Sequence, residues 1–518
     1  MPYAFGARYA QEKGCLPGTR ESFLSDICDI LNNPEDNAPR VCLLIGAAGS
    51  GKSAVAHSVA RLYDDQKRLG SSYCFAGTDV ARRNPQNLFS TVARDLSDHD
   101  PQFKAALWEI VKEDRALRTS QSPFEQVERL IIGPGKDLDA IGPLVIVIDA
   151  LDESGDRASR RQLLRAIADK IASDPLPSNL RFLITARPED DILTALPPGP
   201  QIVRKQMGDI PEHIIDGDIE RFIRHSLQQY TELESSWPNG EWCRLLVHHS
   251  QHLFQWASTA CNFIEGDGTV GLDPSERFDT LLQAAKTDGG HSLDNLYKTI
   301  LGQLFTMDNT RERFRMVMAI VLALKEPLPL ASLSALLGKD LNIRAIIKPM
   351  GSLLDGVFDE DKPIRPLHTS FHDFLLDSTR SSVVFHVHIQ SQHSLCLGRA
   401  LLMCMRNMLR FNICDLKDSR VLNTAIHDLP GRVAKTISPH LSYSCRYWMH
   451  HLPDIECTPD LLNEVTLFFK TFLPYWLEVI SLLSLISPLS SILSALETCT
   501  ILKQWAQVRS RMMVSCEY

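Results

Sequence analysis

The sequence predicts an α/β core with a parallel sheet and flanking helices, followed by helical and winged-helix domains and an all-α remainder. Two observations near the N-terminus predict the core. An unbroken apolar run at Val41–Ile45 has similar runs at Leu144–Ile148 and Arg181–Thr185. Such runs are typical of strands buried on both faces of a parallel sheet. Segments with helical spacing of apolar residues separate these runs, and this alternation indicates a layered α/β architecture.

The elements of the core follow in order. Phe23–Leu31 repeats apolar residues at helical spacing, and Tyr73–Ala76 is a weaker candidate strand. Residues 1–15 show no periodicity, so we expect this stretch to be loosely held. Further helices are expected over Ala54–Arg68, Leu88–Leu96 and Arg160–Ser173.

The pattern changes near Pro211. The chain then reads as successive helices to about Phe305, with breaks at Pro238–Gly240, Glu265–Gly268 and Asp288–Gly290. Arg311–Asp377 reads as a helix, a turn, two short helices, a hairpin and a last helix, which is the content of a winged-helix domain. The expected divisions are a lead-in segment 1–37, an α/β nucleotide-binding domain 38–210, a helical domain 211–308, a winged-helix domain 309–380 and a C-terminal helical domain 381–518.

Residues Gly46–Ser53 read GAAGSGKS, between an expected strand and an expected helix. This fits the phosphate-binding pattern G-x-x-x-x-G-K-[ST], in which glycines let successive backbone N–H groups point at phosphate oxygens. Lys52 can reach the β- and γ-phosphates, and the Ser53 hydroxyl can ligate Mg²⁺. The candidate nucleotide-binding residues here are Gly46, Ala47, Ala48, Gly49, Ser50, Gly51, Lys52 and Ser53.

A second motif, LVIVIDALDE, places Asp149 at the end of an expected strand, with Asp152 and Glu153 just beyond. Parallel sheets bind ligands at this edge, so Asp149 could hold Mg²⁺ through water. Asp152 or Glu153 could orient or deprotonate an attacking water. In the alternative, Glu153 is a solvated charge and Asp152 caps a helix that starts near Ser154.

A third strand ends in Thr185-Ala186-Arg187-Pro188, which would put Arg187 on the same edge as Lys52 and Asp149. A guanidinium there can bind a γ-phosphate and report its presence. The alternative is a surface arginine paired with Glu189 or Asp190. The basic cluster Arg157–Arg161 is expected to be solvated.

Composition narrows the function classes. The formal net charge of −9 gives no bulk attraction to nucleic acid or anionic membranes. The 13 cysteines form no CxxC pair, which indicates a reducing, cytoplasmic compartment. Tyr475–Leu496 is mostly apolar, but Glu478 and Pro488 interrupt it, so we expect two packed helices broken near Pro488 rather than a membrane span.

These motifs, in this order, resemble the NACHT group of STAND P-loop NTPases, and IDALDE and TARPE are the specific signatures. The match extends to segments similar to basidiomycete fungal members, in which this region is also called nephrocystin-3-like. Those segments are Cys15–Glu21, Leu253–Ile264, Arg365–Asp377 and Ser442–Leu452. The resemblance therefore covers roughly residues 15–455.

The resemblance implies a signalling or non-self-recognition switch: a closed diphosphate form held by the winged-helix unit, and a triphosphate form that oligomerises with itself or with protein partners. By the same resemblance, Thr19 and Arg20 would lie near the nucleotide base and His368 would contact the β-phosphate. His368 could instead pack inside the winged helix. We see neither the N-terminal effector domain nor the C-terminal β-propeller repeats of many relatives, and expect the chain to lack them.

Three functions remain open on the sequence alone. The first is a switch with slow NTP hydrolysis, the second an active AAA-like P-loop ATPase, and the third a scaffold protein with a structural nucleotide. The expected cofactors are Mg²⁺ and ATP or ADP, with GTP or GDP as the alternative because no base-reading motif is visible. No nucleic-acid partner is expected, since basic residues interleaved with aromatic ones are not seen.

Overall fold

The computed structural model describes residues 1–35, 37–77, 79–135, 142–172, 177, 179–266, 273–287, 292–338, 341–389, 391–418, 421–452 and 459–485. The described residues fall into two compact units. The first comprises residues 1–266, 272–299 and 368–370, and the second comprises 267–271, 300–367 and 371–518. Each unit is described by itself.

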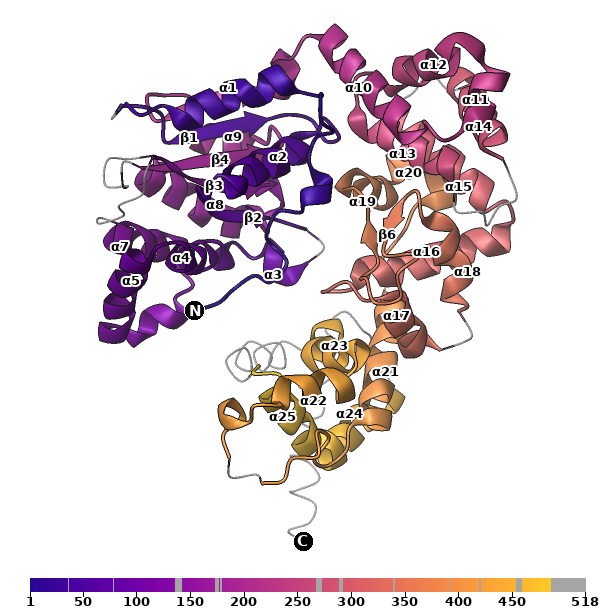
Figure 1. The fold of residues 1–518 in the computed structure, drawn as a ribbon. Helices are drawn as coiled ribbons and strands as arrows, with labels where there is room; N and C mark the ends of the chain where they lie inside the picture. The colour runs from indigo at the N-terminus through magenta and orange to yellow at the C-terminus, as the bar shows by residue number, and fades with distance from the viewer. Residues whose placement is uncertain are drawn as a thin grey trace. The chain divides into compact units, whose positions relative to one another are not determined.

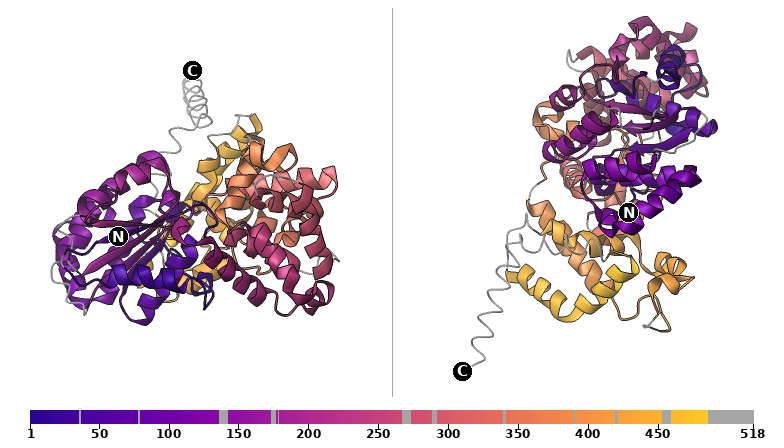
Figure 2. Two further views of the ribbon diagram at one scale, coloured as in Figure 1. Left: turned by 90° about the horizontal axis from the view of Figure 1, so that it is seen from above. Right: turned by 90° about the vertical axis from the view of Figure 1, so that its left-hand side faces the viewer.

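A five-stranded sheet organises the first unit, with strand order β2-β3-β4-β1-β5 and every neighbouring pair parallel. Helices flank it (Figures 1 and 2), which confirms the predicted α/β core. The strands are β1 (Val41–Ile45), β2 (Leu69–Cys74), β3 (Leu144–Asp149), β4 (Leu180–Ala186) and β5 (Ile202–Gln206). The helices around the sheet are α1 (Glu21–Asn32), α2 (Lys52–Asp65), α3 (Val80–Arg83), α4 (Leu88–His99), α5 (Pro101–Glu113), α6 (Pro123–Gln126), α7 (Gly133–Gly135), α8 (Arg157–Ala166) and α9 (Asp190–Ala195).

The core of this unit explains why the strands form where they do. Every residue of β1, β2, β3 and β4 is buried, and side chains such as Leu43, Ile146 and Ile184 meet Phe89 of α4 and Leu163 of α8 in one cluster. Each such burial contributes about 1.5–3 kcal/mol. Strand β5 lies at the sheet edge and is only partly buried. Its sequence IVRKQ contains no apolar run, so the sequence analysis did not predict this strand.

The N-terminal residues are held more firmly than we expected. Ala4 and Ala7 are buried in the core cluster, and the Ala7 carbonyl accepts a hydrogen bond from the Cys74 N–H at 2.7 Å. The Tyr9 N–H donates to the Ser72 hydroxyl. An extended segment fixed by backbone contacts has no side-chain period, so its sequence did not show this order.

Helices complete the first unit: α10 (Glu212–Ser226), α11 (Thr231–Ser236), α12 (Glu241–Ser250), α13 (Phe254–Glu265), α14 (Pro274–Thr287) and the first part of α15 (Ser292–Leu304), which continues into the second unit. The predicted break at Pro238–Gly240 is a single 3₁₀ turn. Of the other two expected breaks, Asp288–Gly290 and the second half of Glu265–Gly268 lie outside the described residues.

The second unit begins with the winged-helix pattern that the sequence predicted. Helices α16 (Asp308–Ala323), α17 (Leu330–Leu337) and α18 (Ile343–Ile347) precede the antiparallel pair β6 (Leu354–Asp355) and β7 (Arg365–Pro366). Helix α19 (Thr369–Leu376) follows, and its first two residues belong to the first unit. The remainder is helical, in orange and yellow in Figure 1: α20 (Ser378–Phe385), α21 (Ser391–Met408), α22 (Leu429–Thr436), α23 (Pro439–Tyr447), α24 (Pro459–Leu467) and α25 (Leu473–Leu482).

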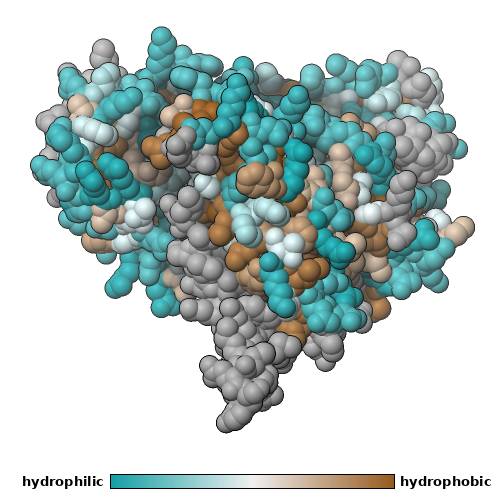
Figure 3. All heavy atoms as spheres, turned by 90° about the horizontal axis from the view of Figure 1, so that it is seen from below, coloured by the Kyte–Doolittle hydropathy of each residue, from teal (hydrophilic) through white to brown (hydrophobic). Residues whose placement is uncertain are grey.

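One helical run among the described residues, Asp460–Leu482, is long and apolar enough to cross a membrane by length and composition, and a third of its most apolar window is buried. A buried helix of a globular protein passes the same test, so this is weak evidence. The predicted break near Pro488 lies outside the described residues. Elsewhere hydrophobic side chains, brown in Figure 3, reach the surface between hydrophilic ones.

Candidate functional site

The order of the strands brings three sequence motifs together. Strand β4 lies between β1 and β3, so the segments that follow these strands leave the same edge of the sheet side by side. They carry Lys52 after β1, Arg187 after β4, and Asp149 as the last residue of β3. The carboxyl edge of a parallel sheet is where ligands bind in such folds.

The loop Gly46–Ser53 connects β1 to α2, as the motif requires. A Cβ at Gly46 would lie 2.7 Å from Met207 Cγ, so only glycine fits there. Gly49 and Gly51 have φ of +78° and +94°, values that favour glycine and turn the loop back on itself. Ala47 and Ala48 form the outer part of the loop, and Ser53 is exposed in the first turn of α2.

Lys52 is 9% exposed, and its Nζ donates hydrogen bonds to the carbonyls of Gly46 and Ala47 at 2.8 and 2.9 Å. Burial lowers the pKa of Lys52, while the nearby Asp152 carboxylate opposes that shift. The ammonium thus lies inside the loop, held by the loop's own carbonyl oxygens. Phosphate oxygens entering the loop would replace weak carbonyl partners with anionic ones.

Arg20 supports the loop from outside. Its guanidinium donates to the Ser50 carbonyl at 3.0 Å and lies 4.8 Å from the centre of the Phe254 ring. Its backbone N–H donates to Asp218 of α10. Thr19 is buried, and its hydroxyl donates to the Leu16 carbonyl. The role of both residues at a nucleotide base stays a prediction.

Asp149 is 4% exposed, and one of its oxygens accepts a hydrogen bond from the Thr185 hydroxyl at 2.5 Å. The Thr185 oxygen in turn accepts from the Ala150 N–H at 3.0 Å, and Ala150 has a left-handed backbone with φ of +57°. This network fixes the direction of the carboxylate. The second oxygen is left for water or a cation.

The two acids after Asp149 are in different surroundings. Asp152 is engaged with Arg187: it accepts from the Arg187 backbone N–H at 2.9 Å and forms an ion pair with the guanidinium at 3.2 Å. Glu153 accepts from the Gly77 N–H at 2.8 Å. Burial raises the pKa of Glu153 to about 7, and the Gly77 hydrogen bond opposes the shift. A carboxyl group with a pKa near neutrality suits a general base.

The acids that follow Arg187 have a cationic partner of their own. Glu189 and Asp191 pair with Arg160, at 2.5 and 2.9 Å. Arg160 is 4% exposed, so the expectation that Arg157–Arg161 is a solvated cluster is wrong at this residue. The two carboxylates that follow β4 compensate the desolvation of the buried Arg160 guanidinium. The spacing of these residues in the sequence does not indicate that they meet.

Thr369 and His368 belong to the first unit as well. Arg187 donates to the Thr369 hydroxyl at 2.7 Å. His368 Nδ1 accepts from the Ser370 N–H at 3.1 Å and lies 2.6 Å from the Ser370 hydroxyl, which contacts Tyr297 at 2.8 Å. The proposed contact between His368 and a β-phosphate stays a prediction.

The expected helix cap near Ser154 is Asp156, not Asp152. The Asp156 side chain accepts from the Ser159 N–H at 2.8 Å at the start of α8.

Two residues near Asp149 were missed by sequence reasoning. His57 on α2 and Cys74 at the end of β2 lie beside it, and both are buried. A single histidine in a helix and a single cysteine in a strand match no sequence motif, so the sequence did not indicate that they meet.

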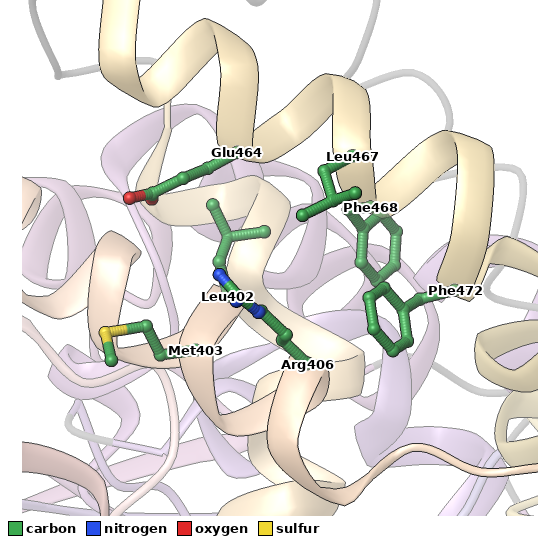
Figure 4. A pocket seen from close by; sticks show the side chains of 7 residues that line it. All are labelled: Leu402, Met403, Arg406, Glu464, Leu467, Phe468 and Phe472. Carbon is green, nitrogen blue, oxygen red and sulfur yellow. The ribbon is translucent and has the colours of Figure 1, made fainter.

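A separate cavity of about 150 Å³ lies in the second unit, between α21 and the helical run that begins with α24 (Figure 4). Apolar side chains dominate its wall, with Arg406 and Glu464 as the charged members. Its other lining residues are Leu402, Met403, Leu467, Phe468 and Phe472. No residue predicted from the sequence as functional lines it.

One comparison with known protein families covers the part of the chain that holds the candidate site. The family model described as "Nephrocystin 3, N-terminal" matches residues 18–187, a range that contains the Gly46–Ser53 loop, Asp149 and Arg187. No curated protein matches the chain. Among solved structures, a Walker-type ATPase of Pyrococcus abyssi is similar at 12% identity with a TM-score of 0.31, covering 71% of this chain and 96% of that one. The parallel sheet of the first unit and its Gly46–Ser53 loop between β1 and α2 are by themselves a P-loop NTPase-like fold.

Proposed function

We propose that this protein is a nucleotide-binding switch of the NACHT and STAND type, which hydrolyses a nucleoside triphosphate slowly and changes conformation and self-association as it does so. The observation that carries the proposal is the meeting of Lys52, Arg187 and Asp149 at the carboxyl ends of β1, β4 and β3. These are a phosphate-binding cation, a second cation and a carboxylate suited to Mg²⁺.

Each residue has a separate part in binding. Lys52 and the N–H groups of the Gly46–Ser53 loop would hold the phosphates, while Ser53 and Asp149 would hold Mg²⁺ directly or through water. Mg²⁺ supplies charge neutralisation between the β- and γ-phosphates when bound. The oxygen donor set of Ser53 and Asp149 fits this ion. ATP is the nucleotide that we propose, and the cytoplasm is the compartment.

The proposal of a switch is supported by how Arg187 is engaged. Arg187 has its backbone and guanidinium bound by Asp152, and it also donates to Thr369. A γ-phosphate that binds Arg187 would compete with Asp152 and Thr369 for the same guanidinium. Binding of a triphosphate and rearrangement around Thr369 are therefore coupled, which is the property of a switch.

Glu153 is the base that we propose for hydrolysis. Its pKa near 7 lets it exist as a carboxylate at neutral pH and still accept a proton. Glu153→Gln is expected to abolish turnover while nucleotide binding is retained. Fast steady turnover by the parent protein would favour an active AAA-like ATPase over a switch.

The deciding experiment measures which nucleotide co-purifies with the full chain and how many phosphates it has. We expect bound ADP, and association into larger particles, measured by light scattering, after exchange to a non-hydrolysable ATP analogue. Lys52→Ala is the matched control and should purify without nucleotide and stay unassociated. A protein that purifies empty and binds neither ADP nor ATP analogue would overturn the proposal.

A further inference from the structure

Three buried side chains of different chemistry converge at the carboxyl ends of β2 and β3. A ring nitrogen of His57, the Cys74 sulfur and a carboxylate oxygen of Asp149 all lie within 4.8 Å of one another. The three side chains are 7%, 5% and 4% exposed. Imidazole, thiol and carboxylate are the usual protein ligands of Zn²⁺.

The fold holds these groups together from three elements. Cys74 and Asp149 are register partners on the parallel strands β2 and β3, so they emerge on the same face of the sheet. Helix α2 lies against both strands, and His57 is one turn after Ser53 on that helix. The arrangement does not depend on a mobile loop.

The distances leave room for an ion. Metal–ligand bonds of about 2.0–2.3 Å in tetrahedral geometry place neighbouring ligand atoms about 3.5 Å apart. A ceiling of 4.8 Å therefore requires only a small contraction. Among the described residues no hydrogen bond joins His57, Cys74 and Asp149 to one another, and Asp149 has one oxygen engaged by Thr185.

We propose that His57, Cys74 and Asp149 form a binding site for a thiophilic divalent cation such as Zn²⁺. The soft sulfur and the imidazole select such an ion over Mg²⁺, which prefers oxygen ligands throughout. Three protein ligands leave a fourth position for water. The ion replaces the proton of the Cys74 thiol, so binding releases one proton for the sulfur–metal bond formed.

The hydrogen bond at the other ring nitrogen adds a consequence. His57 Nδ1 accepts from the Ala10 N–H at 3.1 Å, so Nε2 is the nitrogen left for a cation. A neutral imidazole bound through Nε2 carries its proton on Nδ1, which would then face the Ala10 N–H. Metal binding must therefore break this hydrogen bond and release the backbone at Ala10.

The site would also regulate nucleotide binding, and this part rests on the proposed function. One oxygen of Asp149 accepts from Thr185, so the other oxygen cannot serve Zn²⁺ in this site and Mg²⁺ at the phosphate loop equally well. Occupancy by the thiophilic cation withdraws Asp149 from Mg²⁺. The cluster would thus make nucleotide affinity depend on the supply of a transition metal.

The test uses Co²⁺ as a spectroscopic probe of the full chain. We expect about one Co²⁺ per chain to give a sulfur-to-metal charge-transfer absorption with tetrahedral character. Cys74→Ser should remove this absorption, and His57→Gln should weaken binding. Cys42→Ser is the matched control, because Cys42 is equally buried but on β1, and it should leave the absorption unchanged. Thermal unfolding without metal establishes that each variant is folded.

An absorption that is missing in the parent protein, or that survives in Cys74→Ser, would overturn the site. Hydrogen exchange at the Ala10 amide should become faster on metal loading, and an amide that stays protected would remove His57 from the site. In a second arm, Zn²⁺ should suppress Mg²⁺-dependent ADP binding in the parent but not in Cys74→Ser. Nucleotide binding that never depends on Mg²⁺ would count against the proposed function, and the Co²⁺ result would stand by itself.

Discussion

Lys52 shows how a single side chain can prepare a site. Its ammonium is nearly buried, with two backbone carbonyls of its own loop as partners. Neutral carbonyls compensate a buried cation only in part, and burial lowers the pKa of Lys52 accordingly. An anionic ligand is therefore worth more here than at a solvated lysine.

Replacing Lys52 with alanine is expected to weaken ADP binding by about 100-fold, which corresponds to about 2.7 kcal/mol and to the loss of charged hydrogen bonds to phosphate. Isothermal titration calorimetry measures the change. Lys205→Ala removes a lysine from β5 that pairs with Asp26 and should leave the affinity unchanged. Equal losses in the two variants would contradict the assignment of Lys52.

The raised pKa of Glu153 makes the free energy of unfolding depend on pH. The folded state raises its pKa from 4.5 to about 7, so the folded chain binds this proton more tightly than the unfolded chain does. The free energy of unfolding therefore falls as pH rises from about 4.5 to about 7 and is level above that range.

Glu153→Gln removes this contribution and keeps an oxygen for the Gly77 N–H. The variant is expected to exceed the parent in unfolding free energy above pH 7, by at most about 3 kcal/mol, and to match it near pH 4.5. Urea unfolding across this pH range is the measurement. Glu113→Gln, at an exposed site on α5, should show no such divergence, and parallel curves for Glu153→Gln would refute the shift.

At the scale of elements, the first turn of helix α13 is hydrogen-bonded to the phosphate loop. The Gln255 N–H in its first turn donates to the Gly49 carbonyl at 3.3 Å. A Cβ at Gly49 would lie 2.8 Å from Gln255 Cβ, so the helix leaves no space above the loop. A movement of the loop on nucleotide binding would therefore also displace the start of α13.

Gly49→Ala tests this contact, and Gly6→Ala is its matched control. Both glycines have similar positive φ, +78° and +77°, but nothing lies within 4 Å of a Cβ at Gly6. Gly6→Ala should cost about 1–2 kcal/mol of stability from backbone strain alone. Gly49→Ala should cost more and should also weaken ADP binding, as calorimetry can show. Indistinguishable variants would mean that the loop and α13 move independently.

Elements with a strong pattern were predictable, and those fixed by tertiary contacts were not. The runs that became β1, β3 and β4 are mostly apolar. The loop after β1 has a motif in which phosphate binding explains the spacing of the glycines and the lysine. Strand β5 and the Ala4–Ala7 segment are held by backbone pairing, which leaves no trace in composition. The Asp152–Arg187 pair joins residues 35 positions apart, and no single-sequence pattern reports such a distance.

At the scale of the whole molecule, the proposed ligand site belongs to one compact unit. The phosphate loop, Asp149, Arg187 and His368 are all in the first unit, while the helices from α20 onward are in the second. A ligand that binds only the folded first unit stabilises that unit by mass action. The second unit gains nothing directly.

We therefore expect two thermal transitions in scanning calorimetry, of which Mg²⁺ and ADP raise only one. At a free ADP concentration of 100 times the dissociation constant the gain is about 2.7 kcal/mol, and Lys52→Ala should lose it. A tryptophan probe in the second unit, Trp448 or Trp476, both buried there, identifies the transition that does not move. If both transitions rise together, ligand binding stabilises the second unit as well, and the expectation that the two units unfold independently is wrong.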